Sequence, residues 1–307
     1  MKELKRILIV IVCFTVCFLI LDFGVGQFFD WAIKQMPREG ERVAKSEYIM
    51  NKVEADFIII GSSRAEAHYD SNVIKESFPE YSVFNCGVDG QLFYYINTSF
   101  NAIMDRYTPK IVVWDFQLKD LVDDTTENLS LLYPYYYSND NVRTLLDNQD
   151  YTLKFLLWNN CYRYNGTASR ILRAMRMSDS CKMGFSAHES DDKSRKIKGD
   201  DMNLKNQELI AEKITLLSST IKRAKEKGIK VILCVSPMYV NVNGYSGTID
   251  YLNELAEQNN VIFIDDSQLD EFIRHDEYWY DGGHLNAYGA KKFTKILSRQ
   301  IQESIEL

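Results

Sequence analysis

Short apolar runs alternate with segments of helical spacing along most of this chain. Five runs rich in Ile, Val and Phe predict buried parallel strands at 56–61, 81–84, 110–116, 230–236 and 260–265. Helical spacing is found at 72–77, 92–107, 206–227 and 251–258, and a last amphipathic helix is expected over 287–303. This alternation predicts an α/β fold with a doubly wound, five-stranded parallel sheet.

The first apolar run predicts a membrane helix. Residues 7–21 carry no charge, and they follow a short lead that contains Lys2, Lys5 and Arg6. A further apolar stretch continues the pattern beyond Asp22, which brings the run closer to the ~20 residues that cross a bilayer. The basic lead predicts that the N-terminus stays in the cytoplasm and that the rest of the chain lies outside the cytoplasmic membrane.

The first 30 residues are either a membrane anchor or a cleaved signal segment. Small residues suited to a cleavage site are found only near Val25 and Gly26, so an uncleaved anchor is preferred. Residues 31–52 are expected to form a polar tether, and 53–307 the α/β domain.

An insertion is predicted after the third strand, at about 120–201, where the alternation breaks. It contains aromatic stretches at 131–137 and 156–164 and a charged run at 190–201. Such an insertion is expected to lie over the edge of the sheet at which ligands bind. Its aromatic side chains either stack on sugar rings or form the insertion's own core, and both readings stay open.

The bulk composition excludes some functions. A chain of 307 residues with 46% hydrophobic residues and a net charge of -7 can bury a large core, and its charge disfavours nucleic-acid binding. No Cys and His residues have the spacing of zinc ligands, so neither a metal nor another cofactor is expected. Cys161 and Cys181 lie in the same insertion, and an extracytoplasmic location permits a disulfide between them.

The candidate catalytic residues follow the ends of predicted strands. Ser63, Gly90 and Gln117 each follow the carboxyl end of a predicted parallel strand, and these ends meet at one edge of the sheet. Far along the chain, Asp281 precedes His284 by three residues. A carboxylate at that spacing holds an imidazole in the tautomer that accepts a hydroxyl proton. The sequence therefore predicts a Ser63–His284–Asp281 triad.

These segments resemble the SGNH (GDSL-like) hydrolases and acyltransferases, here a membrane-anchored bacterial member. The segment 56–64 is similar to the family's first block, with Ser62 where better-known members carry Asp; 84–90 is similar to the second, and the Asp281–His284 pair to the last. The resemblance implies the flavodoxin-like SGNH fold, a nucleophilic Ser63, and an oxyanion held by the N–H groups of Ser63 and Gly90, with Gly87 as the alternative to Gly90.

The family's third block, Gly-x-Asn-Asp, is missing after the third strand. Gln117 lies in its place. Either its side chain substitutes for the Asn as an oxyanion donor, or it is a surface residue and two backbone N–H groups suffice.

Arg64 and His68 are four residues apart, on one face of a helix that begins at Ser63, so both are candidates for substrate binding. The alternatives are an ion pair for Arg64 and a surface or core position for His68.

The expected function is therefore that of a serine ester hydrolase or O-acyltransferase. The resemblance and the anchor together imply acyl esters, such as acetyl esters, of envelope or extracellular polysaccharide as substrates, and a polysaccharide-modification machinery as a partner. The alternative is a binding or assembly protein of such a complex, with the same fold and an inactive cleft.

Overall fold

The structure is a computed structural model that describes residues 1–38, 41–178, 182–189, 196–205 and 207–306. The chain forms two units. Unit 1 consists of Met1–Glu47 and Leu129–Asp179, and unit 2 of Tyr48–Asn128 and Ser180–Leu307. Residues 129–179 of the predicted insertion therefore share a unit with the N-terminal helix, whereas both ends of the insertion belong to unit 2.

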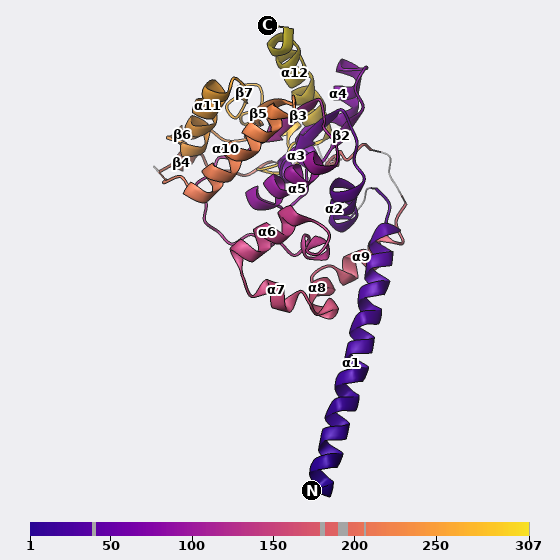
Figure 1. The fold of residues 1–307 in the computed structure, drawn as a ribbon. Coiled ribbons are helices and arrows are strands. Elements are labelled where there is room, and N and C mark those ends of the chain that lie inside the picture. The colour runs from indigo at the N-terminus through magenta and orange to yellow at the C-terminus, as the bar shows by residue number, and fades with distance from the viewer. Residues whose placement is uncertain (39–40, 179–181, 190–195, 206, 307) are drawn as a thin grey trace. The chain divides into compact units, whose positions relative to one another are not determined.

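A parallel sheet is the centre of unit 2 (Figure 1). Its strands are β1 (Phe57–Ile60), β2 (Val83–Asn85), β3 (Ile111–Asp115), β5 (Lys230–Val235) and β7 (Ile262–Asp265). Their order is β2-β1-β3-β5-β7, and every pair is parallel. This confirms the predicted α/β class, and the strand order is the flavodoxin-like one. All four residues of β1 are buried, which explains why this strand is a continuous apolar run.

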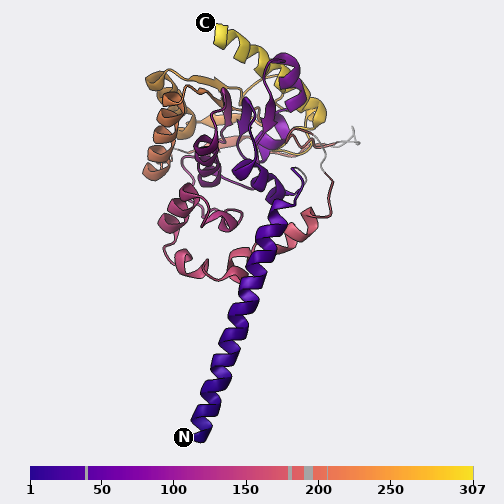
Figure 2. The ribbon, with the colours of Figure 1, turned by 45° about the vertical axis from the view of Figure 1, so that its right-hand side comes forward.

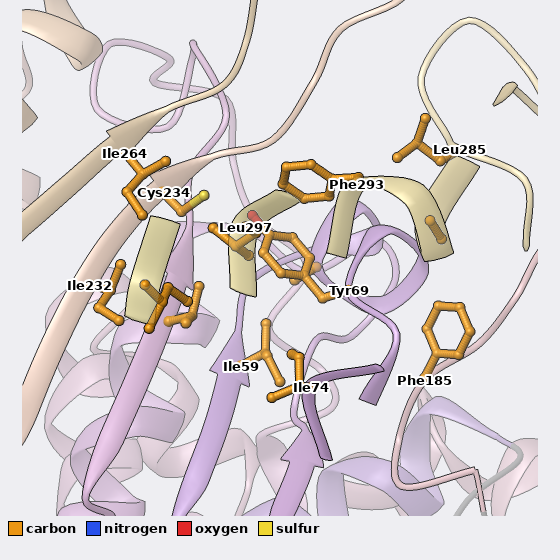
Figure 3. Packing of buried hydrophobic residues seen from close by; sticks show 14 of the residues in the cluster. Ile59, Tyr69, Ile74, Phe185, Ile232, Cys234, Ile264, Leu285, Phe293 and Leu297 are labelled. Atoms are coloured by element: carbon orange, nitrogen blue, oxygen red, sulfur yellow. The ribbon is translucent and has the colours of Figure 1, made fainter. Parts of the chain in front are cut away.

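Helices cover both faces of this sheet. They are α3 (Ser63–His68), α4 (Ser71–Ser77), α5 (Phe93–Arg106), α10 (Ala211–Glu226), α11 (Gly247–Asn259) and α12 (Ala287–Glu306). On one face, Ile59 and Ile232 belong to a core cluster with Phe293 and Leu297 of α12 (Figure 3). Toward α5, the ring of Trp114 lies 6.2 Å from that of Phe93. Burial of each such side chain contributes about 1.5–3 kcal/mol to folding.

Several local expectations need correction. Residues 42–51 were expected in a polar tether, but they form α2 (Arg42–Asn51), because Val43, Ile49 and Met50 are apolar side chains that are buried. A second parallel sheet, of β4 (Met202–Leu204) and β6 (Val242–Gly244), was not predicted, because no residue of either strand is buried and neither strand is an apolar run.

Unit 1 is helical in the part that the structure describes. Its elements are α1 (Lys2–Lys34), the 3₁₀ turn η1 (Tyr133–Tyr135), α6 (Asp140–Gln149), α7 (Leu153–Leu156), α8 (Asn160–Asn165) and α9 (Ala168–Ala174). The helix α1 is long and apolar enough to cross a membrane. In both ribbon views α8 lies beside α1 (Figures 1 and 2).

The insertion's aromatic residues divide into a buried and an exposed group, and sugar stacking by the exposed group stays a prediction. Tyr135 and Tyr164 are buried, and Tyr164 stacks on Phe29 of α1 at 5.1 Å, so these rings belong to the core of unit 1. Phe155 and Trp158 are each 65% exposed and do not. Cys161 is a free thiol, whereas Cys181 lies outside the described residues, so the predicted disulfide stays a prediction.

A prediction concerns Asp56, which precedes β1. Its Oδ2 accepts hydrogen bonds from the hydroxyl (2.7 Å) and N–H (3.0 Å) of Ser82, and its Oδ1 lies 3.0 Å from Lys110 Nζ. The Ser82 bonds, with Lys110, lower the pKa of Asp56 to about 2. Asp56→Ala should lower the free energy of unfolding at pH 7 by about 1 kcal/mol after allowance for solvent screening.

Because the pKa of Asp56 is depressed in the folded chain, this stabilisation is complete above pH ~4 and is lost as pH falls toward 2. Thermal unfolding of both proteins between pH 7 and pH 3 should show melting temperatures that converge as the pH falls. A gap that stays constant with pH would contradict the role of the ionised carboxylate.

Candidate functional site

A tight turn after β1 positions Ser63. Gly61 has φ +152°, and a Cβ atom there would lie 2.6 Å from Ala65 Cβ and 3.0 Å from the carbonyl oxygen of Asp115. Only glycine therefore fits between β1 and β3 at this point. The chain then enters α3, where Ser62 is buried and Ser63 is partly exposed, so Ser63 is the serine that can meet a substrate.

The structure brings together all three residues of the predicted triad. Ser63 Oγ lies 2.9 Å from His284 Nε2, although 221 positions separate the two residues. His284 Nδ1 lies 3.0 Å from Oδ1 and 3.1 Å from Oδ2 of Asp281. The carboxylate, the imidazole and the hydroxyl thus form one continuous hydrogen-bonded chain.

The protonation states follow from these contacts. Burial opposes ionisation of Asp281, but the N–H of Gly283, together with His284, outweighs it and lowers the pKa of Asp281. An ionised Asp281 accepts the Nδ1–H of His284, which leaves Nε2 with a lone pair directed at the Ser63 hydroxyl. Oδ1 also accepts the backbone N–H of His284 at 2.9 Å, so one carboxylate fixes the loop and the ring together.

Of the two glycines proposed as oxyanion donors, Gly90 fits better. The N–H of Gly87 already donates to Asn85 Oδ1 at 2.9 Å, and a Cβ at Gly87 would lie 2.4 Å from Glu66 N. Gly87 is thus needed for the close packing of this loop on α3. Gly90 is exposed with φ +72°, and no hydrogen bond to a described residue engages its N–H. Its role as a donor stays a prediction.

Gln117 lies at the same edge of the sheet as Ser63. Ile60 pairs with Trp114, and Ser63 and Gln117 each follow their paired residue by three positions. The backbone N–H of Gln117 donates to Asp120 Oδ2 at 2.8 Å, so this N–H is occupied within its own loop. Only the side chain of Gln117 remains as a candidate donor.

Arg64 is nearly buried and His68 fully buried, so they do not form an open face for a substrate, which corrects the prediction for both. Arg64 is 8% exposed, and its guanidinium donates to the carbonyl oxygens of Ser236 and Pro237. His68 is 0% exposed. Their polarity serves hydrogen bonds inside the fold, because buried polar groups need partners.

His68 joins three segments at the site. Its Nε2 accepts the backbone N–H of Leu285, next to His284, at 3.1 Å, and its Nδ1 lies 3.1 Å from Ser236 Oγ. Burial, followed by the charge of Arg64, lowers the pKa of His68 well below its ordinary value. The ring is therefore neutral at pH 7. Its Nε2 carries no proton and can accept the backbone N–H of Leu285. His68 is a positioning residue for the loop that carries His284.

The structure also places His188 at the site, which the sequence did not predict. Its ring stacks on Tyr280 at 4.6 Å and 14°, and lies 5.3 Å from the ring of His284. Burial, and then the His284 ring, lower the pKa of His188, so it is neutral at pH 7. No spacing in the sequence marks His188, because it is an isolated residue in an irregular segment. Its side chain forms part of the wall beside His284.

No group of His, Cys, Asp or Glu within the described ranges has an arrangement that could hold a metal ion. The donors gathered here are those of a proton-transfer site.

Comparison with known proteins finds similar solved structures. No family model matches the chain, and no curated protein does. Among solved structures, a Bacteroides fragilis protein assigned as an acylhydrolase is 14% identical, with a TM-score of 0.41 over 86% of this chain and 99% of its own. The lipase/acylhydrolase from Enterococcus faecalis is 12% identical, with a TM-score of 0.40 over 80% and 95%.

A GDSL-like lipase from Bacteroides thetaiotaomicron is also 12% identical, with a TM-score of 0.38 over 85% of this chain and 100% of its own. At these identities and scores, the chemistry of this chain has to be argued from its own residues.

A prediction follows for His68. His68→Phe keeps a ring of similar volume but removes the acceptor for Leu285 N–H, so His284 should shift relative to Ser63. A shift of about 1 Å should slow labelling of Ser63 by a fluorophosphonate by about 10²-fold. His68→Gln, whose amide oxygen can accept the same N–H, should recover part of that rate. Equal labelling of wild type and His68→Phe, with both folded by circular dichroism, would contradict the positioning role.

A second prediction concerns Gln117. We expect Gln117→Ala to keep near-full turnover of a chromogenic acetyl ester, because the N–H groups of Ser63 and Gly90 suffice for the oxyanion. A loss of about 10² to 10³ in kcat with KM unchanged would instead identify the Gln117 amide as a third donor, since such a bond strengthens only in the transition state.

Proposed function

We propose that this protein is a serine ester hydrolase or O-acyltransferase. The observation that carries the proposal is the hydrogen-bonded chain from Asp281 through His284 to Ser63 Oγ, at the carboxyl edge of the parallel sheet. A serine hydroxyl is a weak nucleophile unless a base removes its proton. This arrangement supplies the base, and the carboxylate that orients it.

The first half-reaction forms an acyl-serine. Ser63 Oγ attacks the ester carbonyl carbon while its proton passes to His284 Nε2, and the carbonyl electrons move onto oxygen. Collapse of this oxyanion breaks the bond to the alcohol, which leaves with the proton from His284. Asp281 stabilises the imidazolium that exists between these transfers.

The oxyanion would be held by the N–H groups of Ser63 and Gly90. The N–H of Ser63 lies in the first turn of α3, where backbone donors have no partner within the helix. Removing one such donor from an enzyme costs about 2.7–4 kcal/mol of transition-state stabilisation. In the second half-reaction an acceptor hydroxyl attacks the acyl group. Water makes the protein an esterase, and a sugar hydroxyl makes it a transferase.

We propose acetyl or similar acyl esters of envelope or extracellular polysaccharide as substrates. Two features support this assignment. The helix α1 is a candidate membrane span, and the basic residues before it favour an extracytoplasmic position for unit 2. Envelope polysaccharide in that location would offer both acyl esters and acceptor hydroxyls, and we propose polysaccharide-modification proteins as partners.

The triad yields a direct prediction. Ser63→Ala and His284→Ala should each abolish turnover of a chromogenic acetyl ester to a similar degree, because residues that act as one unit are not additive. Asp281→Asn should be milder. The matched control is Ser62→Ala, which removes the buried neighbouring hydroxyl and should remain active.

Fluorophosphonate labelling distinguishes this enzyme from a binding protein with an inactive cleft. Mass spectrometry of the labelled full-length chain should place the adduct on Ser63. Folded protein that takes up no label at neutral pH would favour the binding or assembly function. An adduct on Ser62 would show that the nucleophile is misassigned by one residue.

A further inference from the structure

The insertion has a basic and apolar surface whose side chains do not pack into its core. Between Tyr151 and Met177 the chain has five basic residues and no acidic one, although its net charge is -7. The large apolar side chains exposed on this stretch, called the insertion surface below, are Tyr151 (67%), Phe155 (65%), Leu156 (40%), Trp158 (65%), Leu172 (43%) and Met177 (41%).

The exposed residues lie in or beside the short helices α7 and α9, which also carry buried apolar residues. In and beside α7, Leu153 and Leu157 are buried, whereas Phe155 and Trp158 are exposed. Lys154 Nζ lies 4.9 Å from the centre of the Phe155 ring. A basic group beside exposed aromatic rings is typical of a helix that lies in the interface of a membrane.

Hydrogen bonds place this surface against the candidate membrane helix. Asp22 of α1 accepts the backbone N–H groups of Asn160 (3.0 Å) and Cys161 (2.8 Å), the first residues of α8. One turn further on, a Cβ at Gly26 would lie 2.5 Å from Asn160 Oδ1, so a larger residue there would displace the Asn160 side chain. Trp158 precedes Asn160 by only two residues and is thus held close to α1.

The length of the apolar run sets the depth at which this contact lies. A bilayer hydrocarbon core about 30 Å thick is crossed by about 20 helical residues. A span that begins at Ile7, directly after the basic lead, therefore ends about at Gly26. Phe23, Phe28 and Trp31 are exposed on α1 around this end, as in the aromatic belts of membrane proteins.

Some basic residues of the stretch are already paired. Arg163 lies 3.6 Å from Asp30, and Arg173 lies 3.0 Å from Glu41. No salt bridge to a described residue engages Lys154, Arg170 or Arg176, so these three remain for an external anion.

We propose that the insertion surface binds the membrane that α1 crosses, with its aromatic side chains at the acyl boundary and Lys154, Arg170 and Arg176 on anionic phospholipid headgroups. The proposal depends on α1 being a membrane helix and not on the chemistry of Ser63. It makes the insertion a second membrane contact, continuous with the first through Asp22.

Photo-crosslinking of the full-length chain in nanodiscs tests this contact. The discs contain phosphatidylcholine and phosphatidylglycerol in a 7:3 ratio, with a trace of lipid that carries a diazirine on its acyl chain. Mass spectrometry should find adducts on α1 and on residues 151–158. It should find none on Tyr245 and Tyr288, which are 53% and 63% exposed in unit 2 and report non-specific labelling.

In the double variant Phe155→Ser, Trp158→Ser the adduct yield on residues 151–158 should fall about tenfold, and the yield on α1 should not change. Tyr245→Ser is the matched control and should change neither. Both variants should give the circular dichroism spectrum and the melting temperature of wild type, which shows that they are folded.

Three outcomes would overturn the proposal. Adducts on α1 with none on residues 151–158 would show that the insertion surface does not contact lipid. No adduct on α1 would show that the anchor itself is misassigned. Equal yields in discs of phosphatidylcholine alone would refute the part assigned to Lys154, Arg170 and Arg176, since their binding requires anionic lipid.

Discussion

The hydrogen bond from Leu285 N–H to His68 Nε2 is the constraint on which the site depends. A serine and a histidine 221 positions apart meet within 2.9 Å only if the segments that carry them are held in register. The parallel sheet places the segments near one another, but strand pairing does not fix a loop such as the one that bears His284. His68 fixes it from the same short helix that begins with Ser63. This hydrogen bond requires a neutral His68 ring, and burial keeps the ring neutral.

The sequence predicts the sheet well, because each strand is a short apolar run between polar segments and both faces of the sheet are covered. The triad was predictable for a similar reason, since Asp281 and His284 lie three residues apart and Ser63 follows a strand. The same reasoning did not predict the positions of Arg64 and His68 correctly. A polar residue next to a nucleophile looks the same in sequence whether it faces a ligand or is buried among carbonyl groups. Only the partners distinguish these cases, and the partners of Arg64 are more than 170 positions away.

Other features could not be predicted because they depend on pairings that leave no local pattern. His188 reaches the site from an irregular segment, and only its stacking on Tyr280 reveals it. Asp22 is similar. In the sequence it interrupts an apolar run, and it weakens the prediction of a membrane helix. In the structure it is buried and accepts the N–H groups at the start of α8, which is the usual way to satisfy a helix terminus and a carboxylate at once.

Gly26 and Asp22 also determine whether another apolar helix could replace the N-terminal helix. Membrane anchors are commonly treated as interchangeable, since any apolar helix of sufficient length will hold a domain at a bilayer. Here a side chain at position 26 would collide with Asn160, and a helix without a carboxylate at position 22 would leave the first N–H groups of α8 unsatisfied. An unrelated anchor would therefore preserve attachment and disturb the insertion. The first helix of this protein is a folded part of unit 1, and its sequence is constrained by packing as well as by hydrophobicity.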